Sequence, residues 1–242
     1  MNLNYNRSIV ILGLGLLVCI LILYVGSPAE DTAEEYVNFS IELIEQGSYD
    51  EAIEKCNQAI DLDQDLTEAY INRAAAYLGK KEFEFAIVDC TRAIELEPNM
   101  VLPYTNRGLA YIETERYENA INDYNKAIDL DPNSAVIYGH LGWAYYLTGK
   151  YDLSIDANIT GLEIDPDQSW IRYNLAIAYF ADESYELAEA AYEEAAETNT
   201  SAIAVEKAIS ELHEFITANP ENEDRAAFIF QILEEAKTKL PY

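Results

Sequence analysis

Glycine, proline, histidine and cysteine are all scarce in this chain of 242 residues. It contains ten Gly, seven Pro, two His and three Cys. So few Gly and Pro favour a helical protein over one rich in turns. Three Cys cannot build a disulfide framework, and two His argue against a histidine-rich metal site. The composition therefore gives no reason to expect a metal or a cofactor.

Positive charge is also scarce. The chain has 15 Lys and Arg against 44 Asp and Glu, which gives a formal net charge of −29. A balance this acidic argues against nucleic acid or an anionic membrane surface as a partner. Hydrophobic residues nevertheless make up 50% of the chain. The protein can therefore bury a substantial core and is not a disordered acidic tail.

One uninterrupted apolar segment, Ile9–Val25, stands near the N-terminus. Its length lies at the short end of the roughly 17–25 residues that cross a bilayer as a helix. Arg7 precedes it and several acids follow, so the charge asymmetry places the N-terminus in the cytoplasm and the rest outside. We expect residues 1–26 to be a retained membrane anchor and residues 27–32 a short linker. A cleaved secretory signal, which would make the protein secreted, and a buried helix of a soluble protein are the alternatives.

The remainder of the chain repeats itself every 34 residues. Five similar segments begin at Gly47, Lys81, Glu115, Gly149 and Glu183. Small residues recur in register with them, because closely packed helix axes leave no room for larger side chains. The three small-residue columns are Ser40, Ala74, Gly108, Gly142 and Ala176; Ala52, Ala86, Ala120, Ser154 and Ala188; and Ala59, Ala93, Ala127, Gly161 and Ala195.

These columns resemble the tetratricopeptide repeat (TPR) family, whose unit is a pair of antiparallel helices. The resemblance implies an all-α, right-handed superhelical solenoid with five units, at residues 33–66, 67–100, 101–134, 135–168 and 169–202. The 34-residue spacing breaks after Thr200. Two further amphipathic stretches, Ala202–Thr217 and about Glu223–Lys239, would then form C-terminal capping helices within residues 203–242, giving about twelve helices beyond the anchor.

The residue types that usually signal catalysis have structural explanations here. Most of the 19 Tyr fall into recurring columns and are expected to pack in the core, as are Cys56 and Cys90 as reduced thiols. Carboxylates are numerous, but no nucleophile motif or glycine-rich phosphate loop accompanies them. We therefore predict no catalytic residues and a protein that is not an enzyme. A helical enzyme that uses surface carboxylates is the remote alternative.

A second apolar stripe runs along the first helix of each unit, beside the packing columns. In the family, the matching stripe lines a concave groove that holds a peptide, and in some members asparagines beside it hold the backbone of an extended peptide. The resemblance therefore implies a largely apolar peptide-binding groove. Burial of this stripe within the superhelix or by the C-terminal cap is the structural alternative. The predicted groove residues are Asn38, Asn72, Asn106, Leu109, Trp143, Tyr146, Trp170, Tyr173, Asn174, Ile177 and Phe180.

Together these features predict a membrane-anchored adaptor or scaffold that binds a protein or peptide outside the membrane. Because the linker of residues 27–32 spans only roughly 20 Å, the partner is expected to be a membrane or envelope protein. A self-associating scaffold, in which the groove receives the cap of another copy, is a further alternative. Aromatic side chains in such a groove would be binding hot spots.

Overall fold

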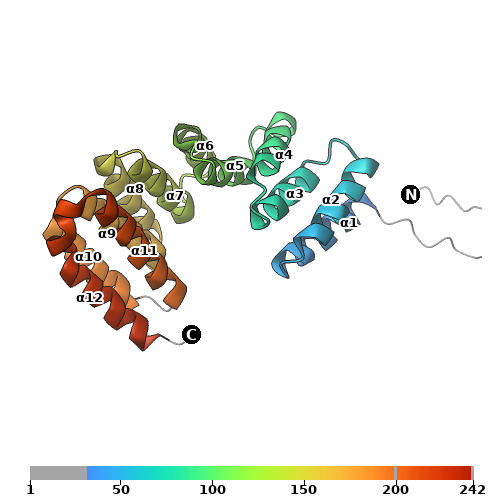
Figure 1. Ribbon diagram of the computed structural model, residues 1–242. Coiled ribbons are helices and arrows are strands. Elements are labelled where there is room, and N and C mark those ends of the chain that lie inside the picture. The colour runs from blue at the N-terminus through green and yellow to red at the C-terminus, as the bar shows by residue number, and fades with distance from the viewer. Residues whose placement is uncertain (1–31, 199–200, 241–242) are drawn as a thin grey trace, which may run out of the picture.

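The computed structural model describes residues 32–198 and 201–240 of the chain. Every regular element in this part is helical (Figure 1). The expected anchor of residues 1–26 and most of the linker lie outside the described residues. Within them, no helix combines the length and the apolar composition that crossing a bilayer requires.

Ten helices form five successive antiparallel pairs, each made of an A helix and a B helix. The first A helix begins after Thr32, which forms a capping box: its hydroxyl accepts from Glu35 N at 3.2 Å, while the Glu35 carboxylate accepts from Thr32 N at 2.7 Å. The pairs are α1 (Ala33–Glu45) with α2 (Tyr49–Leu62), α3 (Thr67–Gly79) with α4 (Phe83–Leu96), α5 (Val101–Glu113) with α6 (Tyr117–Leu130), α7 (Ala135–Leu147) with α8 (Tyr151–Ile164), and α9 (Ser169–Ala181) with α10 (Tyr185–Thr198).

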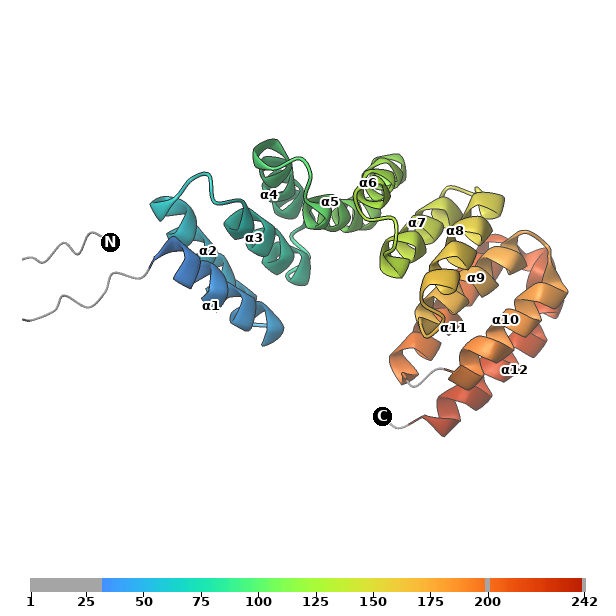
Figure 2. The same ribbon diagram turned by 180° about the vertical axis from the view of Figure 1, so that it is seen from behind.

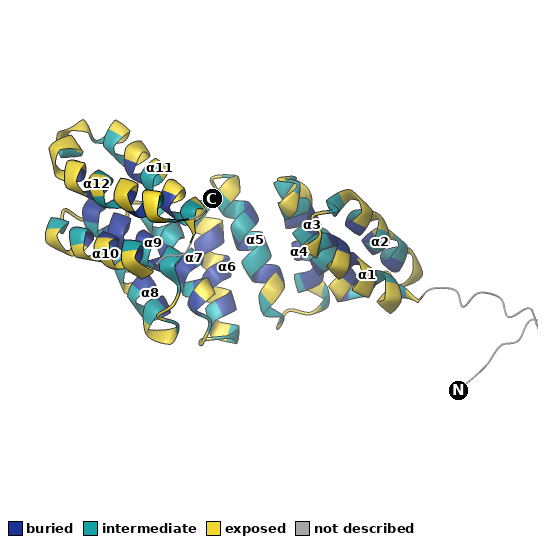
Figure 3. Ribbon diagram, turned by 90° about the horizontal axis from the view of Figure 1, so that it is seen from below, coloured by how far each residue is buried: buried dark blue, intermediate teal, exposed yellow. Residues whose placement is uncertain are grey.

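The pairs stack into an arc. From α3 to α8, the odd-numbered A helices lie on the inner side and the even-numbered B helices on the outer side (Figures 1 and 2). Buried residues lie where neighbouring helices face one another (Figure 3). The all-α solenoid and the twelve helices are as predicted from the repeat and its family resemblance.

The small-residue columns lie at the tightest helix contacts. A Cβ atom added to Gly108 would stand 2.6 Å from the Tyr124 ring, and one added to Gly142 would stand 2.5 Å from the Asn158 amide. Ala52, Ala86 and Ala120 are completely buried. Cys56 and Cys90 are buried free thiols in the same core. Small side chains are therefore required where the A and B helices approach each other most closely.

Two arginines each clamp the A helix to the B helix of their own pair, in the second and third pairs. Arg73 on α3 donates to both carboxylate oxygens of Asp89 on α4, each at 2.7 Å. Arg107 on α5 makes the same bidentate contact with Asp123 on α6, at 2.7 and 2.8 Å. Each arginine also reaches back to the preceding B helix, where Arg107 donates to the Thr91 hydroxyl at 3.0 Å. The clamps thus join α3 and α5 to the B helices on both sides of them.

The C-terminal helices depart from the repeat geometry. Helices α11 (Ala202–Ala218) and α12 (Glu223–Lys239) are separated by a 3₁₀ turn, η1 (Pro220–Asn222). In the regular units, each A helix packs against the preceding B helix. Here α11 packs instead against α9 and α12, while α12 packs against α10. This exchange of neighbours brings α11 over the A helices.

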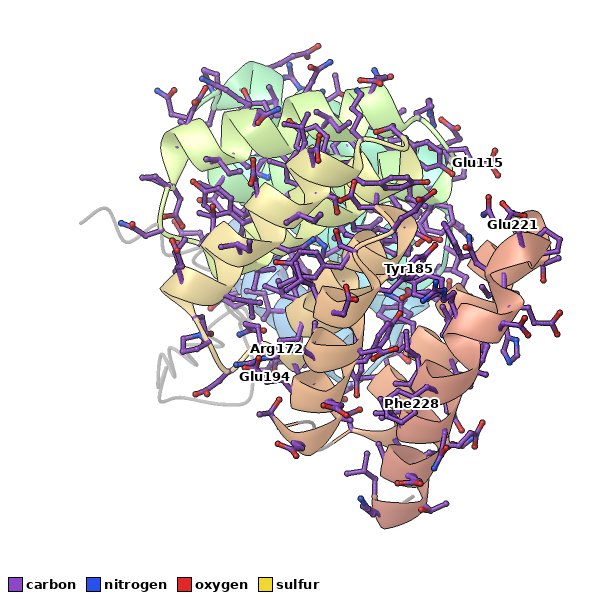
Figure 4. The ribbon with its side chains drawn as sticks, turned by 90° about the vertical axis from the view of Figure 1, so that its left-hand side faces the viewer. Glu115, Arg172, Tyr185, Glu194, Glu221 and Phe228 are labelled. Atoms are coloured by element: carbon purple, nitrogen blue, oxygen red, sulfur yellow. The ribbon has the colours of Figure 1, made fainter. Side chains whose placement is uncertain are left out.

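Contacts at the start of α12 fix it against α10. The Tyr185 hydroxyl donates to Asn222 Oδ1 at 2.9 Å, and the Arg225 guanidinium lies 5.0 Å from the centre of the Tyr185 ring. Nearby, Arg172 Nε on α9 donates to Glu194 Oε1 on α10 at 3.0 Å (Figure 4). Val205 and Leu212 on α11 and Ile229 and Leu233 on α12 are completely buried, which makes the two helices an integral part of the core.

Candidate docking groove

Each A helix carries four residues on the side turned away from its packing columns. They follow the spacing i, i+4, i+7 and i+11, which places them along one helix face. We call this set the inner stripe. It comprises Glu34, Asn38, Ile41 and Glu45 on α1; Glu68, Asn72, Ala75 and Gly79 on α3; Leu102, Asn106, Leu109 and Glu113 on α5; Val136, His140, Trp143 and Leu147 on α7; and Trp170, Asn174, Ile177 and Ala181 on α9.

The inner stripe is open on the first three A helices. All four of its residues on α1 are exposed, and Ile41 keeps 43% of its surface accessible. On α5, Leu102 is 57% exposed, and Asn106 and Leu109 are half-buried. We call the stripes of α1, α3 and α5 the open half of the inner stripe. Its exposed apolar side chains make it a candidate surface for a partner.

Charge in the open half is all of one sign. Glu34 and Glu68 stand at one end of their stripes, and Glu45 and Glu113 at the other. Within the described part of the chain, none of these four carboxylates has a cation within ion-pair distance. On α7 and α9 the corresponding positions hold Val136, Trp170, Leu147 and Ala181. The groove therefore changes from acidic-edged to apolar along its length.

The predicted asparagine ladder is only partly available. Asn72 donates to Val37 O at 3.4 Å and to the Ser40 hydroxyl at 3.1 Å, so its amide ties α3 to α1. Asn174 is buried and donates to Gly139 O at 3.4 Å on α7. The side-chain amides of Asn38, on α1, and Asn106, on α5, make no hydrogen bond to another described residue. These two amides can pair with an incoming backbone, since an amide side chain both donates and accepts.

His140 takes the place of asparagine on α7 and lies in an aromatic stack. Its ring centre is 5.7 Å from that of Tyr124 and 5.2 Å from that of Trp170. Burial, with a smaller contribution from the positive charge of Lys207, lowers the pKa of His140 to about 4. His140 is therefore neutral at pH 7 and acts as a packing residue between α6 and α9.

The two tryptophans of the predicted groove are engaged with the protein itself. Trp170 packs over Gly139, where an added Cβ would stand 2.4 Å from the indole ring, and its Nε1 donates to Gln168 Oε1 at 2.9 Å. Trp143 stacks on Tyr146 with 5.0 Å between ring centres. The ammonium group of Lys207, on α11, lies 5.4 Å from the centre of the Trp143 ring. Both indoles are half-buried.

Helix α11 covers the groove at α9. Tyr173, Asn174, Ile177 and Phe180 are only 3%, 5%, 1% and 1% exposed, and all but Asn174 belong to one apolar cluster with Val205 and Leu212 of α11. Phe180 packs edge-on against Phe215 of α11 at 5.7 Å between ring centres. We call the stripes of α7 and α9, together with the neighbouring Tyr146, Tyr173 and Phe180, the covered half. Five of its predicted groove residues belong to the apolar cluster that includes the chain's own cap: Trp143, Tyr146, Tyr173, Ile177 and Phe180. The other two, Trp170 and Asn174, contact α7 instead.

A buried acid lies at this helix contact. Glu211 of α11 has its Oε1 atom 3.4 Å from Lys207 Nζ. Its surroundings include Tyr146 and Tyr192, whose own pKa values are raised by burial and by the Glu211 charge. Burial raises the pKa of Glu211 above its ordinary value, against the lowering effect of Lys207. The side of α11 that packs on α7 and α9 thus carries one cation, Lys207, above Trp143 and one buried acid, Glu211, beside that cation.

The sequence predicted an apolar stripe on the A helices and gave its burial by the C-terminal cap as an alternative, but it did not place α11 on α9. The recurring small residues end where the 34-residue spacing breaks after Thr200, so they do not predict which helix α11 packs against. The available signal was the apolar side of Ala202–Thr217, which needed a surface to pack on. The aromatic side chains of α7 and α9 supply that surface, and they are buried or half-buried there.

The described residues contain no cluster of side chains suited to a metal ion. No group of three or more His, Cys, Asp or Glu side chains among them is arranged to hold a metal ion. His140 and Glu211, whose pKa values are shifted, are both accounted for by packing between helices. The inner stripe is consequently the leading candidate for a functional surface.

Family models match most of the repeat region. A model described as TPR repeat matches residues 42–81 and 108–149, and two described as tetratricopeptide repeat match residues 67–100, 135–168 and 171–201. The matches fall on all five helix pairs. No curated protein matches the chain by sequence.

Several solved structures share the fold. MamA from Desulfovibrio magneticus RS-1 is 19% identical with a TM-score of 0.64, over 70% of this chain and 96% of that one. The thermophilic TPR protein TTC0263 from Thermus thermophilus is 21% identical with a TM-score of 0.62, over 75% and 99%. YrrB, described as a TPR protein with an unusual peptide-binding site, is 19% identical with a TM-score of 0.61, over 75% and 92%.

Proposed function

The chain belongs to the tetratricopeptide repeat family, and we propose that it is a non-catalytic scaffold that docks a partner protein on the open half of its inner stripe. One observation carries the proposal. Helix α11 covers the inner stripe of α9, whereas the equivalent stripes of α1, α3 and α5 remain without a cover in the described structure. The open half is thus where a second polypeptide can lie without displacing part of the core.

The proposal places the docking surface close to a membrane. Its support is the apolar run Ile9–Val25 with its charge asymmetry, together with α1 beginning at Ala33. The repeats would lie outside the membrane, with the N-terminus in the cytoplasm. Mass spectrometry of the mature N-terminus tests this part: an intact Met1 or Asn2 supports a retained anchor, while a start near Glu30 indicates a secreted protein.

Photocrosslinking in native membranes tests the docking surface. A photoreactive residue replaces Leu109 in the open half, and in a matched control it replaces Asp129, an exposed residue of the outer helix α6. We expect one discrete crosslinked partner at position 109 and none at position 129. A partner that crosslinks equally at both positions, or only at 129, contradicts the proposal. Crosslinking to a second copy of the chain would identify self-association instead.

A further inference from the structure

Among the described residues, the acids of the open half have no cation within ion-pair distance, as is true of most carboxylates in this acidic protein, and the cations nearest to them along the A helices are already paired. Lys80, which follows the stripe of α3, is held by Asp50 at 2.7 Å and by Glu82 at 2.8 Å. Arg73 and Arg107 are committed to their bidentate partners on the B helices. The open half contains no Lys or Arg of its own. Its negative charge is therefore left for a partner to neutralise.

The spacing of these acids suits a helix. Along α1, eleven residues separate Glu34 from Glu45, and the same interval separates Leu102 from Glu113 on α5. At 1.5 Å per residue this is about 16 Å, while a helix with its side chains is about 10–12 Å wide. Ile41 on α1 and Leu109 on α5 lie between the two edges. A helix lying across the A helices would rest its apolar side on them and have acids on both flanks.

The covered half shows that an amphipathic helix can pack on the inner stripe of α9. There the chain's own α11 presents Val205 and Leu212 to the apolar cluster. Lys207, on the same helix, extends its ammonium group over the Trp143 ring at 5.4 Å. An amphipathic helix with a lysine at its edge is therefore already one occupant of this surface.

We propose that the open half binds a basic amphipathic helix of the partner protein, with apolar side chains on Ile41, Leu102 and Leu109 and Lys or Arg toward Glu34, Glu68, Glu45 and Glu113. This inference rests on the proposed docking function and names the chemistry of its partner. Long basic side chains fit because they lay their apolar stems over the groove and place the charge at its edge. Charge complementarity of this kind speeds encounter and excludes acidic partners.

Peptide binding to the full-length protein tests the inference. The protein is held in zwitterionic lipid nanodiscs, and the signal from empty nanodiscs is subtracted. The probe is a fluorescein-labelled 18-residue peptide of leucine and lysine with leucines at helical spacing. We expect saturable binding by anisotropy. Two comparison peptides carry glutamate in place of lysine, or the same leucines and lysines in an order without helical amphipathicity, and both should bind at least tenfold more weakly.

A matched pair of triple variants locates the binding. Glu34→Gln with Glu68→Gln and Glu113→Gln removes three acids of the open half. The control variant, Glu54→Gln with Asp129→Asn and Glu163→Gln, removes three exposed acids of the B helices, so both lose the same charge. We expect the groove variant to bind the Leu/Lys helix at least tenfold more weakly and the control to remain within about twofold of the original protein.

Four results would overturn the inference. Both triple variants could bind the Leu/Lys helix equally weakly, or the permuted peptide could bind as tightly as that helix. The glutamate peptide could bind more tightly than the Leu/Lys helix, or that helix could fail to bind at all. The photocrosslinking experiment does not depend on these results. If a partner still crosslinks at position 109, the docking function holds and only the proposed chemistry of the partner is wrong.

Discussion

The turn between the A and B helices uses one residue in the left-handed backbone region in every unit. Gly47 and Gly149 adopt φ values of 75° and 71°, while Lys81, Glu115 and Glu183 adopt 61°, 59° and 61° at the equivalent positions. A side chain in this region is strained by its own Cβ atom. Three of the five units therefore tolerate a cost that glycine avoids in the other two.

This difference predicts unequal effects of alanine at the same turn position. Gly149→Ala should lower the free energy of unfolding by about 1 kcal/mol, because a Cβ atom enters the left-handed region. No neighbouring atom lies within 4 Å of that Cβ, so the loss would come from the backbone alone. Glu115→Ala should change stability by less than about 0.5 kcal/mol, because that residue already carries a Cβ. Urea denaturation of both variants checks the prediction; equal losses would contradict it.

His140 gives the protein a defined response to acid. Its pKa in the folded protein is about 4, below the ordinary 6.5. The unfolded chain therefore binds a proton at higher pH than the folded one. The stability that neutral His140 contributes is complete above pH 6.5 and is lost as the pH falls from 6.5 toward 4.

Replacing His140 with the asparagine of neighbouring units should remove this dependence. Between pH 7 and pH 4.5 the original protein should lose about 2 kcal/mol more than His140→Asn. Glu211, whose raised pKa acts in the opposite direction, is present in both proteins and cancels in the comparison. Urea denaturation at the two pH values gives the difference, and NMR titration of the His140 ring gives the pKa directly. Parallel losses in the two proteins would show that His140 titrates alike in the folded and unfolded states.

At the scale of a helix pair, the arginine clamp has a natural apolar counterpart. Arg107 and Asp123 occupy the positions that Leu141 and Ala157 hold in the next unit, and all four side chains are largely or wholly buried. In the fourth unit, apolar packing between α7 and α8 thus replaces the ion pair that joins α5 and α6 in the third unit. A buried ion pair often contributes no more stability than well-packed apolar residues, but removing one partner leaves a buried charge unpaired.

The counterpart predicts strong coupling in a double-mutant cycle. Arg107→Leu alone should cost about 3 kcal/mol, because Asp123 keeps its burial and loses its cation. Adding Asp123→Ala should restore most of that loss, since the pair then matches the fourth unit. The four unfolding free energies measure the coupling. Additive losses would mean that the clamp stabilises the pair beyond what apolar packing can supply.

The helices were predictable because their pattern is local and repeated. Tyr49 and Tyr117 begin α2 and α6, and Pro98 and Pro132 follow the ends of α4 and α6. The cover over Ile177 and Phe180 was not predictable from the same columns. It depends on α11, which contacts Trp143 of α7 from a position about 60 residues further along the chain and outside the repeat. Long-range packing of an irregular element leaves no periodic signal in the sequence.

The whole molecule has two different ends. At the C-terminus, α11 and α12 cover the last repeat with completely buried side chains. At the first described unit, Phe39 remains 47% exposed, with Lys55 stacked 5.5 Å from its ring centre. In a linear array each unit is stabilised by its neighbours, so a unit that lacks one neighbour opens more easily.

Hydrogen exchange should therefore be faster in α1 and α2 than in α9 and α10. The measurement is peptide-level deuterium uptake followed by mass spectrometry. Leu212→Ala, which leaves a cavity beneath α11, should raise exchange in α9 and α11 and leave α1 unchanged. Uniform exchange from end to end would indicate that the array unfolds as a single cooperative unit, in conflict with this expectation.

The side-chain ties between A helices also set how the arc responds to a pulling force. The Asn72 amide links α3 to α1 by donating a hydrogen bond to a main-chain oxygen, and the Asn174 amide links α9 to α7 in the same way. Among the described residues, Asn106 and His140 make no equivalent tie on either side of α5. We therefore expect the solenoid to be stiffer on either side of the third unit than at the third unit itself. When the chain is pulled from its two ends, the distance between neighbouring A helices should increase first around α5, at the boundary between the open and covered halves.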